Sequence, residues 1–145
     1  MALADGRVEV VRLSDEPLEM PRIAYDRHNG SAYRYVYSVG ARDRRGDDFV
    51  TRLVRLDVVT GTTRIWSEPG RYPGEPVCVP LPDRARNEGS ESNEDAGVVL
   101  SLGLDSTNQS SFLLVLDAAT FGELARAEVP HPVPFDFHGL FLRDA

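Results

Sequence analysis

The chain has 145 residues, of which 41% are hydrophobic, so we expect one globular domain, 1–145, with its own core. Its formal net charge is −7 and all 16 basic residues are arginine, which argues against nucleic acid as a partner. No apolar run approaches the roughly 20 residues that cross a bilayer, and the N-terminus lacks a signal-peptide pattern. We therefore expect no transmembrane segment and a cytoplasmic location.

Short runs of Val, Leu, Tyr and Phe alternate with polar residues along the whole chain and are bounded by Gly, Pro, Asn and Asp. This alternation is typical of β-strands, and no segment shows a convincing helical pattern. The strands that we expect are 8–13, 20–25, 33–39, 50–58, 62–66, 76–79, 98–104, 112–117, 124–129 and 138–142. The sequence therefore predicts an antiparallel all-β fold.

The segment 82–96 contains Asp, Arg, Asn, Glu, Gly and Ser and almost no apolar residue. Such a segment cannot bury a core face, so it is predicted to be a mobile polar surface loop. The one cysteine, Cys78, stands in an apolar run and has no partner for an internal disulfide, which indicates a buried and inert thiol. The absence of lysine fits a salt-adapted host and a GC-rich genome equally well.

A turn pattern occurs twice. Asp57 is followed by Thr60 and Gly61, and Asp117 by Thr120 and Gly122, with the two threonines 60 residues apart. A strand, turn and strand that recur at a long fixed period are typical of β-propeller blades, whose usual period is roughly 40 to 50 residues. Asp and Gly are also common in ordinary hairpin turns for their backbone geometry. The repeat alone leaves both interpretations open.

Glu19, Glu75 and His138 are 56 and 63 residues apart, which brackets that period. In a propeller the innermost strand of each blade lines the central channel, so one residue per blade can converge on the axis. A metal there needs a neutral imidazole whose other N–H is held, and a carboxylate can hold it. On their own, such glutamates are more often solvated, and a histidine near a terminus is more often bonded to backbone.

Three segments together resemble the C-terminal portion of the carotenoid oxygenases, the non-haem iron carotenoid-cleavage enzymes. They are Phe137-His138-Gly139-Leu140-Phe141, Leu18-Glu19-Met20-Pro21-Arg22-Ile23 and Tyr72-Pro73-Gly74-Glu75-Pro76-Val77. The segments 95–101, 112–118 and 124–131 are similar to the family as well. The resemblance covers most of the chain, from about residue 8 to residue 142.

The resemblance implies a partial β-propeller, the last two to three blades of about seven. It makes His138 one of four histidines that bind Fe(2+), and it gives Glu19 and Glu75 the family's role of hydrogen-bonding ligand histidines. The three further histidine ligands and another such glutamate lie upstream in the family and are missing from this chain. Neither His28, in a turn by composition, nor His131, between two prolines, replaces them.

The activity implied is oxidative cleavage of a double bond of a carotenoid or apocarotenoid by O2, to two carbonyl products. Phe135, Phe137 and Phe141 are candidates for an apolar substrate tunnel and equally for core packing. One histidine cannot hold iron with useful affinity, so we expect the chain alone to be inactive and to need the remaining blades, supplied by a separate chain or by a corrected reading frame. The alternatives are a non-catalytic propeller fragment that acts as an interaction module and a decayed gene product. The substrate, cleavage as against isomerisation, and peripheral contact with a membrane stay open.

Overall fold

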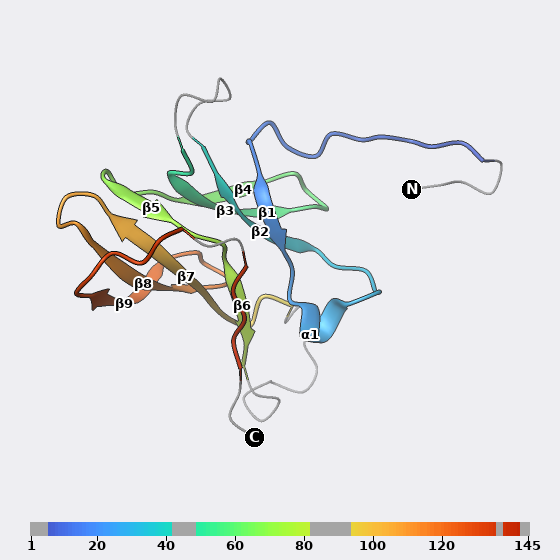
Figure 1. Cartoon of the computed structure of the whole chain (residues 1–145). Coiled ribbons are helices and arrows are strands. Elements are labelled where there is room, and N and C mark those ends of the chain that lie inside the picture. The colour runs from blue at the N-terminus through green and yellow to red at the C-terminus, as the bar shows by residue number, and fades with distance from the viewer. Residues whose placement is uncertain (1–5, 42–48, 82–93, 136–137, 143–145) are drawn as a thin grey trace.

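A computed structural model describes residues 6–41, 49–81, 94–135 and 138–142 (Figure 1). The first antiparallel sheet contains β1 (Glu19–Arg22), β2 (Tyr35–Gly40), β3 (Arg52–Asp57) and β4 (Thr63–Trp66), in the order of the chain. Each strand therefore pairs with the one before it, as a meander does. A single helical turn, α1 (Tyr25–His28), joins β1 to the rest of this sheet.

The second antiparallel sheet repeats this plan. Its central strands are β7 (Gly97–Asp105), β8 (Ser110–Asp117) and β9 (Glu123–Val129), again paired in chain order. Two short strands, β5 (Arg71–Pro73) and β6 (Val77–Pro80), pair with successive parts of one edge of β7. The edge formed by β5 and β6 thus corresponds to β1 of the first sheet, and the chain forms two consecutive blades of a partial β-propeller.

The repeated turns are built alike. Oδ1 of Asp57 accepts hydrogen bonds from the backbone N–H groups of Val59 and Thr60 at 3.0 and 3.3 Å. Oδ1 of Asp117 accepts the equivalent bonds from Ala119 and Thr120 at 3.1 and 2.6 Å. Each aspartate ends the third strand of its meander and begins the turn to the fourth, because its carboxylate satisfies turn amides that the sheet leaves unpaired. The repeat is therefore a property of the two blades and not of two unrelated hairpins.

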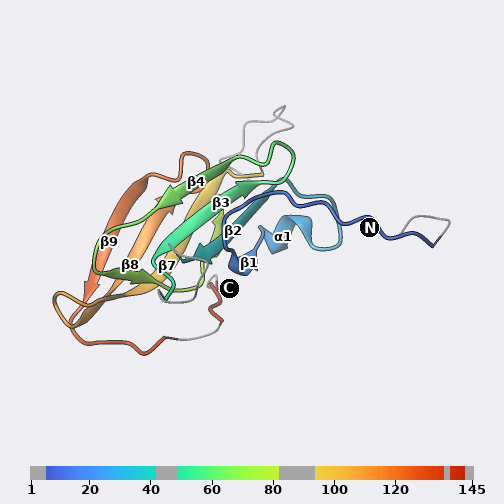
Figure 2. The same cartoon turned by 90° about the horizontal axis from the view of Figure 1, so that it is seen from above.

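The two sheets lie face to face, one above the other (Figure 2), and bury a common core between them. The residues of this core are Tyr37, Val39, Leu53, Val99, Phe112, Leu114, Leu116, Ala118 and Phe121. On β8 the buried residues alternate, with Leu114 fully buried and Leu113 on the opposite face only partly covered. The second sheet therefore keeps an apolar outer face that the described residues cover only in part.

Four details differ from the strands expected from sequence. The segment 8–13 forms no extended strand: within it only Val8 forms an isolated bridge, and Val10 is 89% exposed. The segment 138–142 is irregular backbone, held by side-chain contacts instead of a ladder. The three-residue strand β5 and the single turn α1 were not predicted, because elements so short carry no periodic pattern.

Most of the polar loop predicted at 82–96 lies outside the described residues. Its described end is not a free loop, since Glu94 and Asp95 contact the first sheet just before β7 begins. In the described part of the chain, no helix is long and apolar enough to cross a membrane.

Candidate functional site

The site begins at an interruption in the edge of the second sheet, between β5 and β6. There Gly74 donates its N–H to the carbonyl of Leu102 at 2.9 Å, and Ser101 Oγ donates to the carbonyl of Gly74, also at 2.9 Å. The approach is so close that a Cβ on Gly74 would lie 2.5 Å from the Leu102 carbonyl oxygen. Only glycine fits here, and the interruption presents the following residue, Glu75, to the C-terminal segment.

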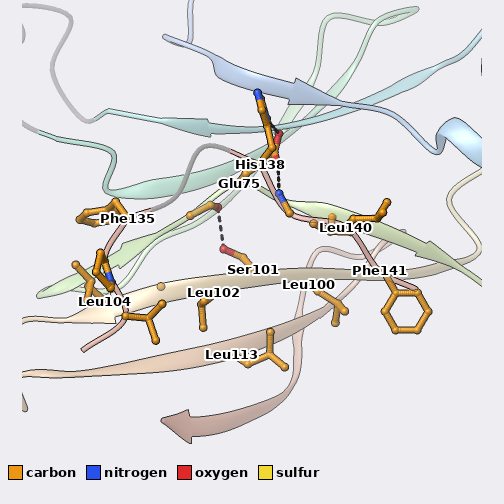
Figure 3. A pocket seen from close by; sticks show the side chains of 16 residues that line it. Glu75, Leu100, Ser101, Leu102, Leu104, Leu113, Phe135, His138, Leu140 and Phe141 are labelled. Atoms are coloured by element: carbon orange, nitrogen blue, oxygen red, sulfur yellow. Dashed lines mark hydrogen bonds and ion pairs between the residues drawn. The ribbon is translucent and has the colours of Figure 1, made fainter. Parts of the chain in front are cut away.

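Glu75 is a buried carboxylate, with 8% of its surface exposed. Its Oε2 accepts the backbone N–H of Gly139 at 2.8 Å, and its Oε1 lies 3.0 Å from Nδ1 of His138 (Figure 3). A buried charge is expensive unless it is hydrogen-bonded, and these two contacts come from adjacent residues of the C-terminal segment. The two contacts therefore stabilise the buried carboxylate of Glu75 and, in turn, hold residues 138–139 in place.

The contact also sets the orientation of the His138 ring. An ionised carboxylate can only accept hydrogen bonds, so the neutral imidazole facing it carries its proton on Nδ1. The lone pair is then on Nε2, at the other edge of the ring, and 74% of the side chain is exposed. A carboxylate bound to one imidazole nitrogen is a common way to fix the orientation of a histidine that binds a metal through the other nitrogen.

The segment leading to His138 is fixed to the second sheet. The backbone N–H of Val133 donates to Oγ of Ser111, a side chain on β8, at 2.8 Å. Farther along, the ring of Phe135 packs on that of Phe49, with centroids 4.6 Å apart. The Ser111 and Glu75 contacts hold the segment on the second sheet, and the Phe49 contact joins it to the residues that precede β3 of the first sheet.

A cavity of about 230 Å³ lies between this segment and the outer face of the second sheet. Leu100, Leu102 and Leu104, alternate residues of β7, line it together with Leu113 of β8. Figure 3 shows Leu104 and Phe135 at one end, Phe141 at the other, and the Glu75–His138 pair between them. The walls are mostly apolar, so the cavity suits a hydrocarbon surface next to the imidazole.

The structure brings together two of the three residues singled out by spacing. Glu19 begins β1 and is exposed, at a position that corresponds to that of Glu75 in the second sheet, and it makes no contact with His138 in the described residues. His28 ends α1 and its Nδ1 bonds to the Ala32 carbonyl at 3.0 Å, while His131 is exposed. Among the described residues, no three His, Cys, Asp or Glu side chains gather as a metal site would require.

Sequence reasoning missed one member of the site, Arg22 of β1. Its Nη1 lies 3.6 Å from Oε1 of Glu75, and its Nη2 donates to the carbonyl of Gly139 at 3.3 Å. An arginine in a polar strand pattern gives no signal of a partner 53 or 117 residues away in the chain. The same strand-edge region holds Cys78, whose burial raises its pKa to about 12 against the opposing effect of Arg22, so its thiol stays protonated at neutral pH.

Comparison with protein families identifies a match to the model of the retinal pigment epithelial membrane protein over residues 1–143. The mitochondrial carotenoid-cleaving dioxygenase of Pongo abelii is 45% identical over 126 residues, which are 86% of this chain and 21% of that protein. The β,β-carotene 15,15'-dioxygenase of Homo sapiens is 39% identical over 130 residues, 89% of this chain and 22% of that protein.

Solved structures agree. Cobalt-substituted apocarotenoid oxygenase of Synechocystis has a TM-score of 0.83 and 28% identity, covering 97% of this chain and 28% of its own. A Glu150Asp mutant of that oxygenase has a TM-score of 0.78 and 27% identity, covering 91% and 26%. The chain therefore spans about a fifth of the curated relatives and about a quarter of the solved structures that it matches.

Proposed function

Because the chain belongs to the family of the retinal pigment epithelial membrane protein and the carotenoid oxygenases, we propose that it is the C-terminal portion of a non-haem Fe(II) dioxygenase. The substrate class is a carotenoid or apocarotenoid, and the reaction is oxidative cleavage of one double bond to two carbonyl products. Relatives named as carotenoid-cleaving dioxygenases support the reaction type. The cytoplasmic location expected from the sequence belongs to the same proposal.

The observation that carries this proposal is the buried Glu75 bound to Nδ1 of His138. The donor chemistry fits iron, since a neutral imidazole with its Nδ1–H held by a carboxylate offers Nε2 to a divalent cation. His138 would supply one ligand, and three histidines of the remaining blades would supply the others. When bound, the iron would provide a coordination position for dioxygen next to the polyene.

The residues of this chain would have two further tasks. The leucines of β7 and the rings of Phe135 and Phe141 would hold an apolar polyene beside the imidazole and exclude water from it. Glu19 would play the part of Glu75 for a histidine of a neighbouring blade. Glu19 is exposed at the start of β1, so its carboxylate is accessible to such a histidine.

The described part of the chain lacks a three-ligand metal group, so activity would require the remaining blades of the propeller. The second candidate function is a non-catalytic interaction module. It is favoured by the incompletely covered outer face of the second sheet, where Leu102 is 41% exposed, and by the exposed Leu124 on the edge strand β9.

The test is the iron content of the purified protein together with O2-dependent bleaching of a carotenoid. Both are measured on this chain alone and on this chain co-expressed with the remaining blades of a carotenoid oxygenase propeller. We expect iron and bleaching only in the co-expressed sample, and loss of both in His138→Ala. His131→Ala is the matched control, because it removes an exposed histidine outside the site. A co-expressed complex that assembles but holds no iron would reject the dioxygenase and favour the interaction module.

A further inference from the structure

Arg22 contacts both sheets next to His138. This arginine ends β1, the first strand of the first sheet, whereas Glu75 lies on the edge of the second sheet. Its guanidinium reaches both the carboxylate of Glu75 and the carbonyl of Gly139. One side chain therefore joins the first blade, the buried carboxylate and the backbone next to the histidine.

The charges explain why an arginine stands there. The side chain of Glu75 is 5% exposed, and its two hydrogen bonds come from neutral donors, the imidazole and the Gly139 N–H. A neutral donor compensates a buried carboxylate less well than a cation does. Arg22, 24% exposed, supplies the nearby positive charge, and its planar fork allows two acceptors to be reached at once.

The geometry closes a ring of contacts. Glu75 accepts from the N–H of Gly139, Arg22 donates to the C=O of the same residue, and Arg22 pairs with Glu75. The peptide groups on both sides of Gly139 are thus held, and the preceding residue is His138. The guanidinium also lies over the ring of Tyr25, with its Cζ 5.6 Å from the ring centroid.

We propose that Arg22 is a positioning residue for His138: it fixes Glu75 and the Gly139 backbone relative to the first blade, so that the imidazole is presented at a set place between the two blades. The inference rests on the proposed function, because a set place matters only if ligands from other blades must meet the same metal. It goes beyond that function by assigning a role to a residue that acts through Glu75 and the Gly139 backbone.

The test compares Arg22→Gln and Arg22→Lys with Arg52→Gln. Arg52 is the matched control, since it is a partly buried arginine of the same sheet whose Nη1 pairs with Glu16 at 3.1 Å, away from the site. The first readout is backbone hydrogen exchange of residues 138–142 in the chain. The second is the ¹⁵N signal of the His138 imidazole, assigned with His138→Gln, which reports whether the proton is on Nδ1.

We expect Arg22→Gln to speed exchange at Gly139 by about tenfold relative to β8 and to mix the two imidazole tautomers. Arg22→Lys should restore part of the protection, because an ammonium keeps the charge but cannot contact both acceptors as a fork does. Arg52→Gln should leave both readouts unchanged. In the assembly with the remaining blades, Arg22→Gln should weaken iron binding by about 10- to 100-fold.

Unchanged Gly139 exchange and unchanged imidazole signals in Arg22→Gln, with β8 still protected, would overturn the role of Arg22 even if the wild-type assembly binds iron. An equal response to Arg22→Gln and Arg52→Gln would also overturn it, because the effect would then be general destabilisation. A wild-type assembly without iron would reject the proposed function, whereas the exchange comparison on the chain would still decide the role of Arg22.

Discussion

Two arginine–carboxylate contacts join the same two sheets at different places, and they are built differently. Arg55 of β3 meets Asp95, in the turn before β7, with Nη2 and Oδ2 2.5 Å apart and both side chains largely buried. Arg22 of β1 meets Glu75 at 3.6 Å, and its second contact is to the backbone of the C-terminal segment. In the first contact both charged groups are paired and largely buried, and we call it the closed contact. The second contact lies next to His138, whose side chain is 74% exposed.

The residues around Arg55 help to hold its guanidinium against Asp95. The guanidinium lies on the ring of Tyr35, 3.7 Å from the centroid, and Glu94 accepts the backbone N–H of Tyr35 at 2.9 Å. A cation–π contact, an ion pair and a hydrogen bond to the backbone N–H of Tyr35 therefore lie together around Arg55. The Arg55–Asp95 contact thus pairs two largely buried charges, whereas the Arg22–Glu75 contact also holds the backbone next to the exposed His138.

The shared core should matter more than either contact. Leu114 is fully buried between the sheets, so Leu114→Ala should lower the free energy of unfolding by about 3 to 4 kcal/mol. Leu113→Ala, one residue along β8 on the cavity side, should cost about 1 kcal/mol, because its side chain is covered only in part. Urea unfolding measures both. Equal losses would mean that the two faces of β8 are equally packed, against the comparison drawn here.

The next largest effect should come from breaking the closed contact. Arg55→Met keeps the apolar stem but leaves Asp95 without its cation, and should cost about 2 to 3 kcal/mol in urea unfolding. Arg64→Met, at the position paired with Arg55 on the neighbouring strand β4 and exposed, is the control and should cost less than about 0.5 kcal/mol. A loss for Arg55→Met no larger than that of the control would show that the contact contributes no more than a surface ion pair.

The sequence predicted the parts of this molecule that depend on local chemistry. Alternating strands and the turns at Asp57 and Asp117 follow from neighbours in the chain, so they were found with good bounds. The segment 8–13 has the same alternation, yet a strand also needs a partner along its length, and within this segment only Val8 forms a bridge. An alternating pattern therefore predicts which segments can form a strand. Whether a strand forms depends on a neighbouring strand being brought close by the tertiary structure.

The candidate site was predicted to a different extent for each residue. Spacing and resemblance singled out Glu75 and His138, which the structure places 3.0 Å apart, and Glu19, which remains away from them. Arg22 could not be found this way, because its role depends on two partners brought close only by the packing of the sheets. Apolar residues on both faces of β7 were a usable signal for the cavity, since alternate leucines at 100, 102 and 104 need a cover.

The pH dependence of stability should differ between a carboxylate in the turn after β3 and a carboxylate on the surface. Hydrogen bonds from Arg34, and then from the backbone of Val59 and Thr60, hold the pKa of Asp57 well below its usual range. A lowered folded-state pKa stabilises the fold above the unfolded pKa of about 4, and this stabilisation is lost as pH falls. Asp57→Asn keeps the turn acceptor but removes the charge, so stability should fall less steeply below about pH 4. Asp15→Asn, with a side chain 88% exposed, should leave the acid slope unchanged.

The smallest difference between the two arginine contacts should be seen in the rate at which the Cys78 thiol is chemically labelled. Cys78 lies in one hollow lined by Tyr37 and Asp95 and in another lined by Arg22 and Phe141. With its pKa raised to about 12, the thiol should react with iodoacetamide at pH 8 roughly a hundred- to a thousandfold more slowly than in the unfolded chain.

Arg55→Met should speed this labelling, because labelling follows opening of the sheets and the closed contact opposes it. Arg22→Gln should not speed the labelling, because it removes a cation that lowers the pKa of the thiol and leaves the Arg55–Asp95 contact in place. Faster labelling in Arg22→Gln than in Arg55→Met would reverse the comparison and make Arg22 the contact that holds the blades together.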